Sequence, residues 1–130
     1  MITMSNQKLV VIGNGMVGQK LLEALVAGNS NYAITVLGEE PRAAYDRVHL
    51  SEYFTGRTAD DLLLAPADFY SQNNITLKLG VQATAIDRDT RKVTGSDGSS
   101  TPYDILVLAT GSYPFVPPVP GKDREHIHVY

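Results

Sequence analysis

The sequence predicts an α/β fold, in which a parallel sheet built on a glycine-rich strand–helix–strand unit is accompanied by a small antiparallel meander. Three observations lead to this prediction. Two segments, 8–12 and 104–108, each contain a run of four aliphatic residues without polar alternation. Such runs are typical of strands buried on both faces of a parallel sheet. Glycines and then an amphipathic helical pattern follow the first of them directly. Short β-rich segments separated by turn residues fill much of positions 75–103.

The opening unit is predicted to pair the strand 8–12 in parallel with a second, β-branched strand at 32–37. Between them the pattern from Met16 onward is that of an amphipathic helix, which Gly28 is expected to end. We expect Val17, Leu21 and Leu25 on its apolar face and Gln19, Lys20 and Glu23 on its polar face.

The middle of the chain is predicted to be an irregular binding loop over 39–56, followed by two short helices. Thr58 is expected to cap the first, through residues 61–64, and Pro66 to lead into the second, through residue 72. The aromatic side chains of this region are expected to pack rather than to stack on a ligand: Tyr45, Tyr53, Phe54, Phe69 and Tyr70.

The later strands are expected to form the antiparallel meander, from segments 75–79, 83–87, 92–94 and 101–103. The aliphatic strand 104–108 then returns to the parallel sheet. Beyond residue 111 the chain is rich in proline, so we expect an extended exit without helix.

Composition restricts the classes of function. The 130 residues fit one compact domain, and a net charge of -3 disfavours a nucleic acid or an anionic membrane as partner. With no cysteine, the chain cannot form a disulfide or a Cys-ligated iron–sulfur cluster, so redox chemistry would require a bound organic cofactor. No apolar run approaches the roughly 20 residues that span a bilayer. A cytoplasmic protein is therefore expected.

The pattern Gly-x-Gly-x-x-Gly joins the first strand to the helix, and this context predicts a Rossmann-like dinucleotide site. Free N–H groups and the positive dipole end of the helix would attract an anion. Gly13 would permit the tight turn, Gly15 the approach of a pyrophosphate, and Gly18 close packing of helix and strand. The candidate ligand-binding residues are Gly13, Asn14, Gly15, Met16, Val17 and Gly18. The alternative is a structural turn without a ligand.

Two glutamates follow the second strand at the position where dinucleotide folds carry an acidic residue. Glu39 and Glu40 stand 21 and 22 residues after Gly18. A carboxylate there would accept hydrogen bonds from the ribose diol and repel a 2′-phosphate, which disfavours NADP in this slot. We prefer Glu39 because it is nearer the strand end; the alternative for both is a solvated turn.

The choice between NAD and FAD depends on the returning strand, which ends in Ala109, Thr110 and Gly111 before a proline-rich exit. With the glycine loop and the meander, this ending resembles the two-dinucleotide-binding-domain flavoproteins. Within that family, the sequence Tyr-Asp-Arg-Val-His-Leu-Ser at 45–51 and the loop Gly-Asn-Gly-Met-Val-Gly are similar to the large subunits of assimilatory NAD(P)H nitrite reductases. The resemblance covers essentially the whole chain.

This resemblance implies roles for further residues. Arg47 would reach the FAD phosphates, the backbone of Ala83 would meet the adenine edge, and Ala109, Thr110 and Gly111 would line the pyrophosphate side. From charge alone, Arg47 could instead form a surface ion pair with Asp46 or Glu40. Related ferredoxin-type reductases have a lysine where this chain has Glu52. No side chain, His49 included, is assigned a catalytic or metal-binding role.

The resemblance also implies an organisation larger than this chain. Residues 1–115 would be the FAD-binding domain, and 116–130 a crossover toward an NAD(P)H-binding domain that the chain does not include. The whole enzyme would use NAD(P)H, FAD, siroheme and an iron–sulfur cluster to reduce nitrite to ammonia in nitrate assimilation. Its partners would be the rest of the reductase and a small subunit, and this portion alone would be inactive.

Two alternatives of other classes stay open. The chain could be a nucleotide-binding module or sensor that takes NAD or an adenine nucleotide without turnover. An NAD-dependent dehydrogenase is a third hypothesis, but it requires a catalytic domain after the fold, which the sequence does not encode.

Overall fold

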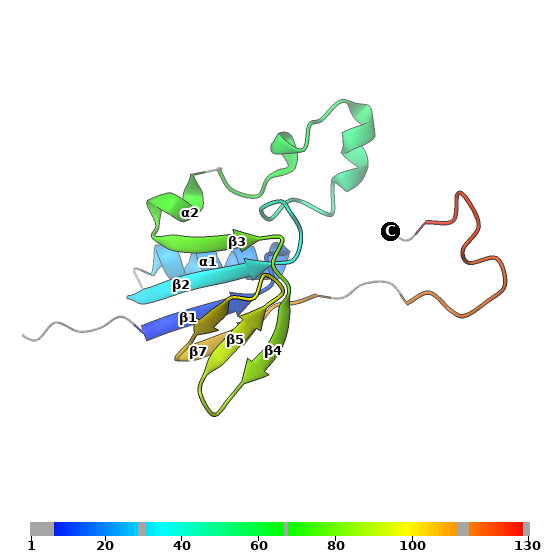
Figure 1. Cartoon of the computed structure of the whole chain (residues 1–130). Helices are drawn as coiled ribbons and strands as arrows, with labels where there is room; N and C mark the ends of the chain where they lie inside the picture. The colour runs from blue at the N-terminus through cyan, green and yellow to red at the C-terminus, as the bar shows by residue number, and fades with distance from the viewer. Residues whose placement is uncertain (1–6, 29–30, 67, 112–114, 129–130) are drawn as a thin grey trace, which may run out of the picture.

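The computed structural model describes residues 7–28, 31–66, 68–111 and 115–128, and Figure 1 shows a helix, a parallel sheet and a small second sheet. The strands of the parallel sheet lie in the order β3-β2-β1-β7. Their bounds are Gln7–Ile12 for β1, Tyr32–Gly38 for β2, Ile75–Leu79 for β3 and Ile105–Leu108 for β7. All three neighbouring pairs are parallel, which confirms the opening unit and the returning aliphatic strand.

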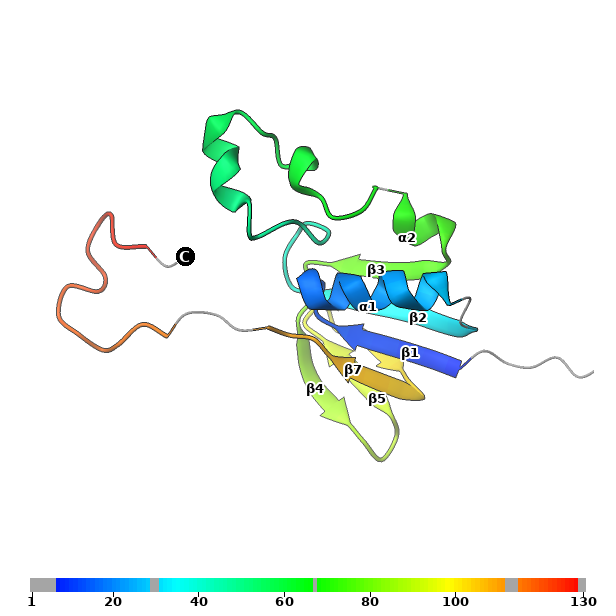
Figure 2. The same cartoon turned by 180° about the vertical axis from the view of Figure 1, so that it is seen from behind.

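Alternate residues of the central strands pack into two separate core clusters. On one face, Leu9 and Val11 of β1 contact Leu22 of helix α1 (Met16–Ala27). On the other face, Val10 and Ile12 pack with Val93 of the second sheet. The parallel sheet therefore lies between the helix and the second sheet, as Figure 2 shows from behind.

The second sheet is antiparallel, as expected, but it contains three strands rather than four. Its order is β4-β5-β6, with bounds Ala83–Asp87, Lys92–Gly95 and Ser100–Pro102. The expectation that segment 75–79 belongs to it is wrong, because β3 pairs in parallel with β2. Its buried Ile75 belongs to the helix-side core. An edge strand of a parallel sheet is half-exposed, so it has the same alternating pattern as a meander strand.

The predicted faces of helix α1 are wrong for Val17 and Gln19, although Lys20 is exposed as expected. Val17 is 76% exposed, whereas Gln19 is only 1% exposed and Leu22 is buried. The orientation follows from Gly18, which lies so close to the sheet that a Cβ there would be 2.8 Å from the carbonyl oxygen of Gly13. Residues adjacent to Gly18 on the helix surface are thereby directed into the core. Leu21 and Leu25 remain partly buried at its edge.

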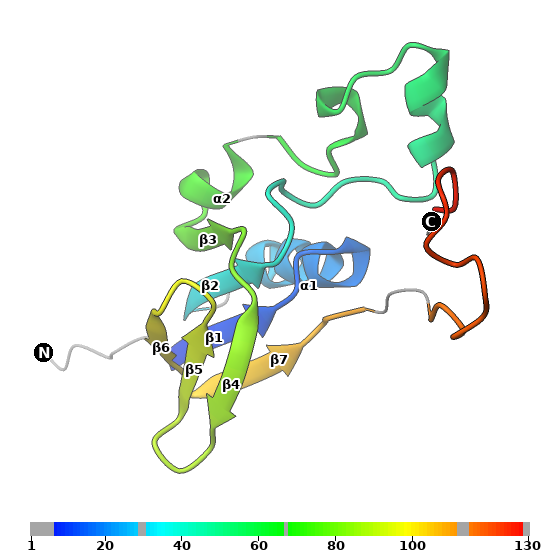
Figure 3. The ribbon, with the colours of Figure 1, turned by 45° about the vertical axis from the view of Figure 1, so that its right-hand side comes forward.

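The segment between β2 and β3 extends away from the sheet, as Figure 3 shows, and we call residues 39–64 the excursion. The expected irregular loop contains a 3₁₀ helix, η1 (Leu50–Thr55), and a second, η2 (Asp60–Leu62), follows. The helix expected over 61–64 is replaced by the shorter η2, whose N-cap is Ala59 without a side-chain capping bond. Thr58 precedes it and bonds to it: its hydroxyl accepts from the Asp61 N–H (3.2 Å) and its own N–H donates to the Asp61 carboxylate (2.9 Å).

The remaining expectations for this region have mixed outcomes. Helix α2 (Phe69–Gln72) is shorter than expected, and position 67, at its expected beginning, lies outside the described residues. Phe69 and Tyr70 pack on the helix-side core, as expected. Phe54 is 89% exposed and Tyr53 is more than half exposed, so the expectation that these two pack inside is wrong for this chain.

The described part of the exit, residues 115–128, contains no helix or strand, as expected. It is not extended throughout, because hydrogen-bonded turns begin near its middle, for example from Arg124 N–H to the Gly121 carbonyl (3.1 Å). Pro114 lies outside the described residues. Among the described residues, no helix has the length and apolar character that crossing a membrane requires.

Candidate dinucleotide site

The glycine loop and the end of β7 lie directly beside each other. The Ala109 N–H donates a hydrogen bond to the Ile12 carbonyl (2.8 Å), which continues the pairing of β1 and β7 beyond both strands. Gly13 has φ +112°, and a Cβ there would overlap the carbonyl group of Ala109. Glycine is therefore required at position 13 for both conformation and space. Two of the predicted ligand-binding segments thus form one continuous surface.

Gly15 differs from its two neighbouring loop glycines. A Cβ at Gly15 would meet no protein atom within 4 Å, whereas a Cβ at Gly13 or at Gly18 would lie within 3 Å of a backbone oxygen. The first α1 hydrogen bond runs from Gln19 N–H to the Gly15 carbonyl (2.9 Å). The N–H groups of the preceding turn have no acceptor within the helix. The loop therefore offers backbone hydrogen-bond donors. It also leaves open space at Gly15, the one loop glycine that packing within the protein does not require.

The end of β2 forms the next wall of the site. The Gly13 N–H donates to the Leu37 carbonyl (2.8 Å), and a Cβ on Gly38 would lie 3.3 Å from Cβ of Asn14. Glu39 is the next residue along the chain, and it is exposed. The predicted acidic partner therefore leaves the sheet beside the glycine loop.

Glu40 is engaged within the protein. Its carboxylate forms an ion pair with Arg47. Partial burial, followed by interaction with the Glu40 carboxylate, raises the pKa of Tyr45 above its ordinary value. Of the two glutamates, only Glu39 is left facing solvent without a described contact.

Arg47 lies on the excursion, away from the loop glycines in sequence. Its guanidinium pairs with Glu40 and lies over the Tyr45 ring, with Cζ 4.9 Å from the ring centroid. The ion pair that the charge pattern allowed is thus present. The predicted contact of Arg47 with a phosphate stays a prediction.

The last predicted contacts come from the start of β4 and the end of β7. The Val81 N–H donates to the Gly38 carbonyl (2.9 Å), which brings the half-buried Ala83 close to the end of β2. After Ala109, both Thr110 and Gly111 are exposed. Gly111 has φ +66°, a left-handed conformation that turns the chain away from the strand.

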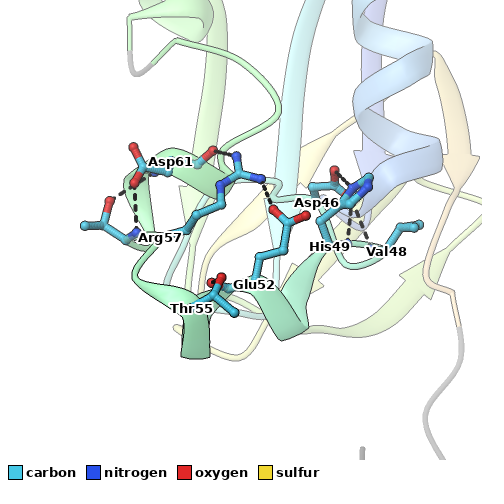
Figure 4. Close-up of polar contacts among 8 residues, drawn as sticks. Asp46, Val48, His49, Glu52, Thr55, Arg57 and Asp61 are labelled. Carbon is cyan, nitrogen blue, oxygen red and sulfur yellow. Dashed lines mark hydrogen bonds and ion pairs between the residues drawn. The ribbon is translucent and has the colours of Figure 1, made fainter.

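The excursion is held together by polar contacts among its own residues, which Figure 4 shows. Asp46 accepts hydrogen bonds from the N–H groups of Val48 (3.0 Å) and His49 (3.2 Å), and it contacts Nδ1 of His49 (2.6 Å). The hydrogen bond with His49 lowers the pKa of Asp46. Arg57 pairs with Glu52 and donates to the Asp61 carbonyl (2.7 Å). Glu52 is therefore engaged in an ion pair.

The sequence analysis did not predict a group of polar side chains that lies behind the glycine loop and consists of Tyr70, Gln19 and Asn14. The Tyr70 hydroxyl donates to Oε1 of the buried Gln19 (2.7 Å) and accepts from Nδ2 of Asn14 (3.5 Å). The available sequence signal was a glutamine directly after Gly18, the glycine that packs against the sheet. Its helical neighbours were assigned to the wrong face, so this signal was missed.

Comparison with known proteins identifies the fold and its family. A model of the family described as pyridine nucleotide-disulphide oxidoreductase matches residues 7–130. The chain belongs to this oxidoreductase family. The match confirms the resemblance that the glycine loop, the excursion sequence and the end of β7 indicated.

Curated relatives of this oxidoreductase include nitrite reductases. The NAD(P)H nitrite reductase large subunit of Klebsiella oxytoca is 50% identical over 129 residues, which are 98% of this chain and 14% of that protein. The NADH nitrite reductase large subunit of Escherichia coli (strain K12) is 45% identical over 129 residues, 98% of this chain and 15% of that protein. The chain therefore spans about one seventh of the length of these relatives.

Solved structures support the same fold. Putidaredoxin reductase, in its covalent complex with putidaredoxin, has a TM-score of 0.82 and 38% identity, covering 88% of this chain and 28% of that one. A ferredoxin reductase from Rhodopseudomonas palustris has a TM-score of 0.87 and 25% identity, covering 94% of this chain and 30% of that one. This family member therefore shares the fold of a part of each of these two reductases.

Proposed function

We propose that this chain is the FAD-binding part of an NAD(P)H-dependent nitrite reductase. The observation that carries the proposal is the contact between Gly13 and Ala109, beside the open space at Gly15. This arrangement suits a diphosphate, because it combines unpaired helix N–H groups with a surface from which side chains are excluded. FAD, when bound, would supply the redox chemistry by accepting a hydride from NAD(P)H and passing electrons onward.

The glycine loop would hold the pyrophosphate from one side. Its backbone N–H groups after Gly13, in the stretch from Asn14 to Gly18, would donate to the phosphate oxygens. Ala109, Thr110 and Gly111 would line the opposite side, because they follow directly on the strand that pairs with β1. The exposure of Thr110 and Gly111 supports this role.

The adenosine end would lie toward β2 and β4. Glu39 would accept hydrogen bonds from the ribose diol, and its exposure at the end of β2 favours it over the engaged Glu40. The backbone of Ala83 would meet the adenine edge. Arg47 would contact the phosphates only if its guanidinium exchanges Glu40 for them, which planar bidentate donors can do.

The wider assignment comes from the relatives. Their names support nitrite as the substrate of the complete reductase and NAD(P)H as its electron donor. We propose siroheme and an iron–sulfur cluster as its later redox groups, in parts of the enzyme outside this chain, and a small subunit as partner. Residues 1–115 would form the FAD domain and 116–130 the crossover, in a cytoplasmic protein of nitrate assimilation.

Titration of the purified 130-residue protein with FAD and with NAD tests the proposal. The chain contains no tryptophan, so flavin fluorescence can be followed without competing indole emission. We expect quenching of FAD fluorescence at a one-to-one ratio and weaker binding of NAD. Preference for NAD or an adenine nucleotide would instead favour a nucleotide-binding module or sensor and would overturn the flavoprotein assignment.

A further inference from the structure

The hydroxyl of Tyr70 joins three separate parts of the chain. It donates a hydrogen bond to Oε1 of Gln19 on α1 (2.7 Å) and accepts one from Nδ2 of Asn14 in the glycine loop (3.5 Å). The Tyr70 side chain also belongs to the core cluster against which Ala43, at the base of the excursion, packs. A phenolic hydroxyl has one proton to donate and two lone pairs, so it can make both hydrogen bonds at once.

The surroundings of this hydroxyl make the contacts specific. Gln19 is 1% exposed, and Tyr70 and Ala44 are buried. Two polar atoms of the group, Oδ1 of Asn14 and Nε2 of Gln19, have no described partner. Burial of unpaired polar atoms is unfavourable, so a core that needed only to be stable would carry apolar side chains here.

Packing of Tyr70 connects this group to the base of the excursion, where Ala43 contacts the same core cluster. The Ala44 carbonyl accepts from the Leu64 N–H (3.1 Å), and the Asp46 N–H donates to the Leu62 carbonyl (2.7 Å). These bonds join the segment just before Arg47 to the end of the excursion. Tyr70 is therefore placed to hold the glycine loop and the segment that carries Arg47 in one relative position.

We propose that Tyr70 is a positioning residue, whose hydroxyl fixes the glycine loop against the base of the excursion and thereby increases the affinity for FAD. The inference rests on the proposed function. It concerns a side chain behind the loop, which need not touch the cofactor. Asn14 would transmit the effect directly, because it belongs to the loop itself.

The test measures FAD affinity of the full 130-residue chain and of Tyr70→Phe, which removes only the hydroxyl. We expect the dissociation constant for FAD to rise by about fivefold to twentyfold, as for loss of a buried hydrogen-bond network. Tyr103→Phe is the matched control, since Tyr103 is half-buried and packs on the opposite core cluster. Its dissociation constant should stay within about twofold of wild type.

Two further measurements separate positioning from stability. Affinities are compared at a temperature at which circular dichroism shows every variant to be folded, and thermal unfolding without FAD is measured separately. A merely structural role would lower the unfolding temperature of Tyr70→Phe and leave its FAD affinity at low temperature unchanged. The visible circular dichroism of bound flavin should also change in Tyr70→Phe and not in Tyr103→Phe.

Gln19→Met gives a second, independent test and serves alone if Tyr70→Phe does not fold. It removes the acceptor at similar volume and should weaken FAD binding in the same range. Because both changes break one hydrogen bond, the double variant should lose less affinity than the product of the single losses. Unchanged affinity in these variants, beside a wild type that binds FAD, overturns the positioning role alone. A wild type that takes up no FAD overturns the proposed function as well.

Discussion

The glycine loop and the excursion are held in place by different kinds of interaction. At the loop, backbone lies against backbone: Gly13 faces the carbonyl of Ala109, and strand pairing fixes both. The excursion depends on exposed side chains, such as the pairs of Arg57 with Glu52 and His49 with Asp46. Exposed pairs contribute little and are screened by salt. The difference teaches that the proposed diphosphate site is fixed by backbone packing, whereas the exposed ion pairs of the excursion, beyond its hydrogen-bonded base, can exchange partners.

Gly13→Ala should have the largest effect on the molecule. The added Cβ would overlap the Ala109 carbonyl in a left-handed conformation, so we expect a loss of at least about 3 kcal/mol in the free energy of unfolding. Gly98→Ala is the control, since Gly98 also has positive φ but open space around it, and it should cost about 1 kcal/mol. Denaturant unfolding measures both. Equal losses would mean that close packing at the loop is unimportant.

Gly15→Val should separate binding from folding. No protein atom lies within 4 Å of its Cβ position, so the free energy of unfolding should change by less than about 1 kcal/mol. Affinity for FAD should fall about a hundredfold or more, because the side chain would occupy the diphosphate space. Fluorescence titration and chemical unfolding give the two quantities. Normal FAD affinity in this variant would exclude the loop as the diphosphate site.

Glu39→Ala should weaken FAD binding by about 1.5 to 3 kcal/mol, the range for hydrogen bonds to a charged group. Glu40→Ala is the matched comparison, since Glu40 already pairs with Arg47 and Tyr45. Its loss frees the guanidinium for phosphate, so FAD affinity should not decrease. Isothermal titration of both variants distinguishes the two glutamates. The reverse order of affinities would assign the diol to Glu40.

Asp46→Asn should have the smallest effect, confined to the excursion and dependent on pH. Since the folded-state pKa of Asp46 lies below its ordinary value, the carboxylate stabilises the folded state above that ordinary value, and the contribution is lost as pH falls through the folded pKa. Hydrogen exchange of the Val48 and His49 amides should therefore be faster in the variant at pH 6, with the difference vanishing in strong acid. Asp89→Asn serves as an exposed control, and a pH-independent difference would contradict the assignment.

Local patterns predicted the central architecture because the responsible interactions are local or strongly apolar. Segment 8–12 and the residues after it determine a buried strand, a turn and a helix without reference to distant residues. The faces of α1 could not be obtained in this way. They depend on Gly18 approaching Ala109, a contact between positions far apart in sequence.

Other errors of the sequence prediction have the same cause, because they depend on contacts between residues far apart in sequence. Segment 75–79 alternates as a meander strand does, and only its pairing with β2 reveals an edge strand of the parallel sheet. The exposure of Phe54 depends on where the excursion lies in space. Of the candidate site, the positions of the loop glycines and Ala109 followed from sequence, but the engagement of Arg47 by Glu40 and the contacts of Tyr70 required coordinates.

The strand order also has a consequence for synthesis of the protein on the ribosome. Gly13 is made early, but its neighbour Ala109 directly follows β7, the last strand of the parallel sheet, so the two meet only after β7 emerges. Nascent chains arrested before residue 104 would carry the whole glycine loop and lack the surface opposite it. Under the proposed function, flavin binding would wait until translation has passed the meander, and premature release would leave an apolar sheet edge exposed.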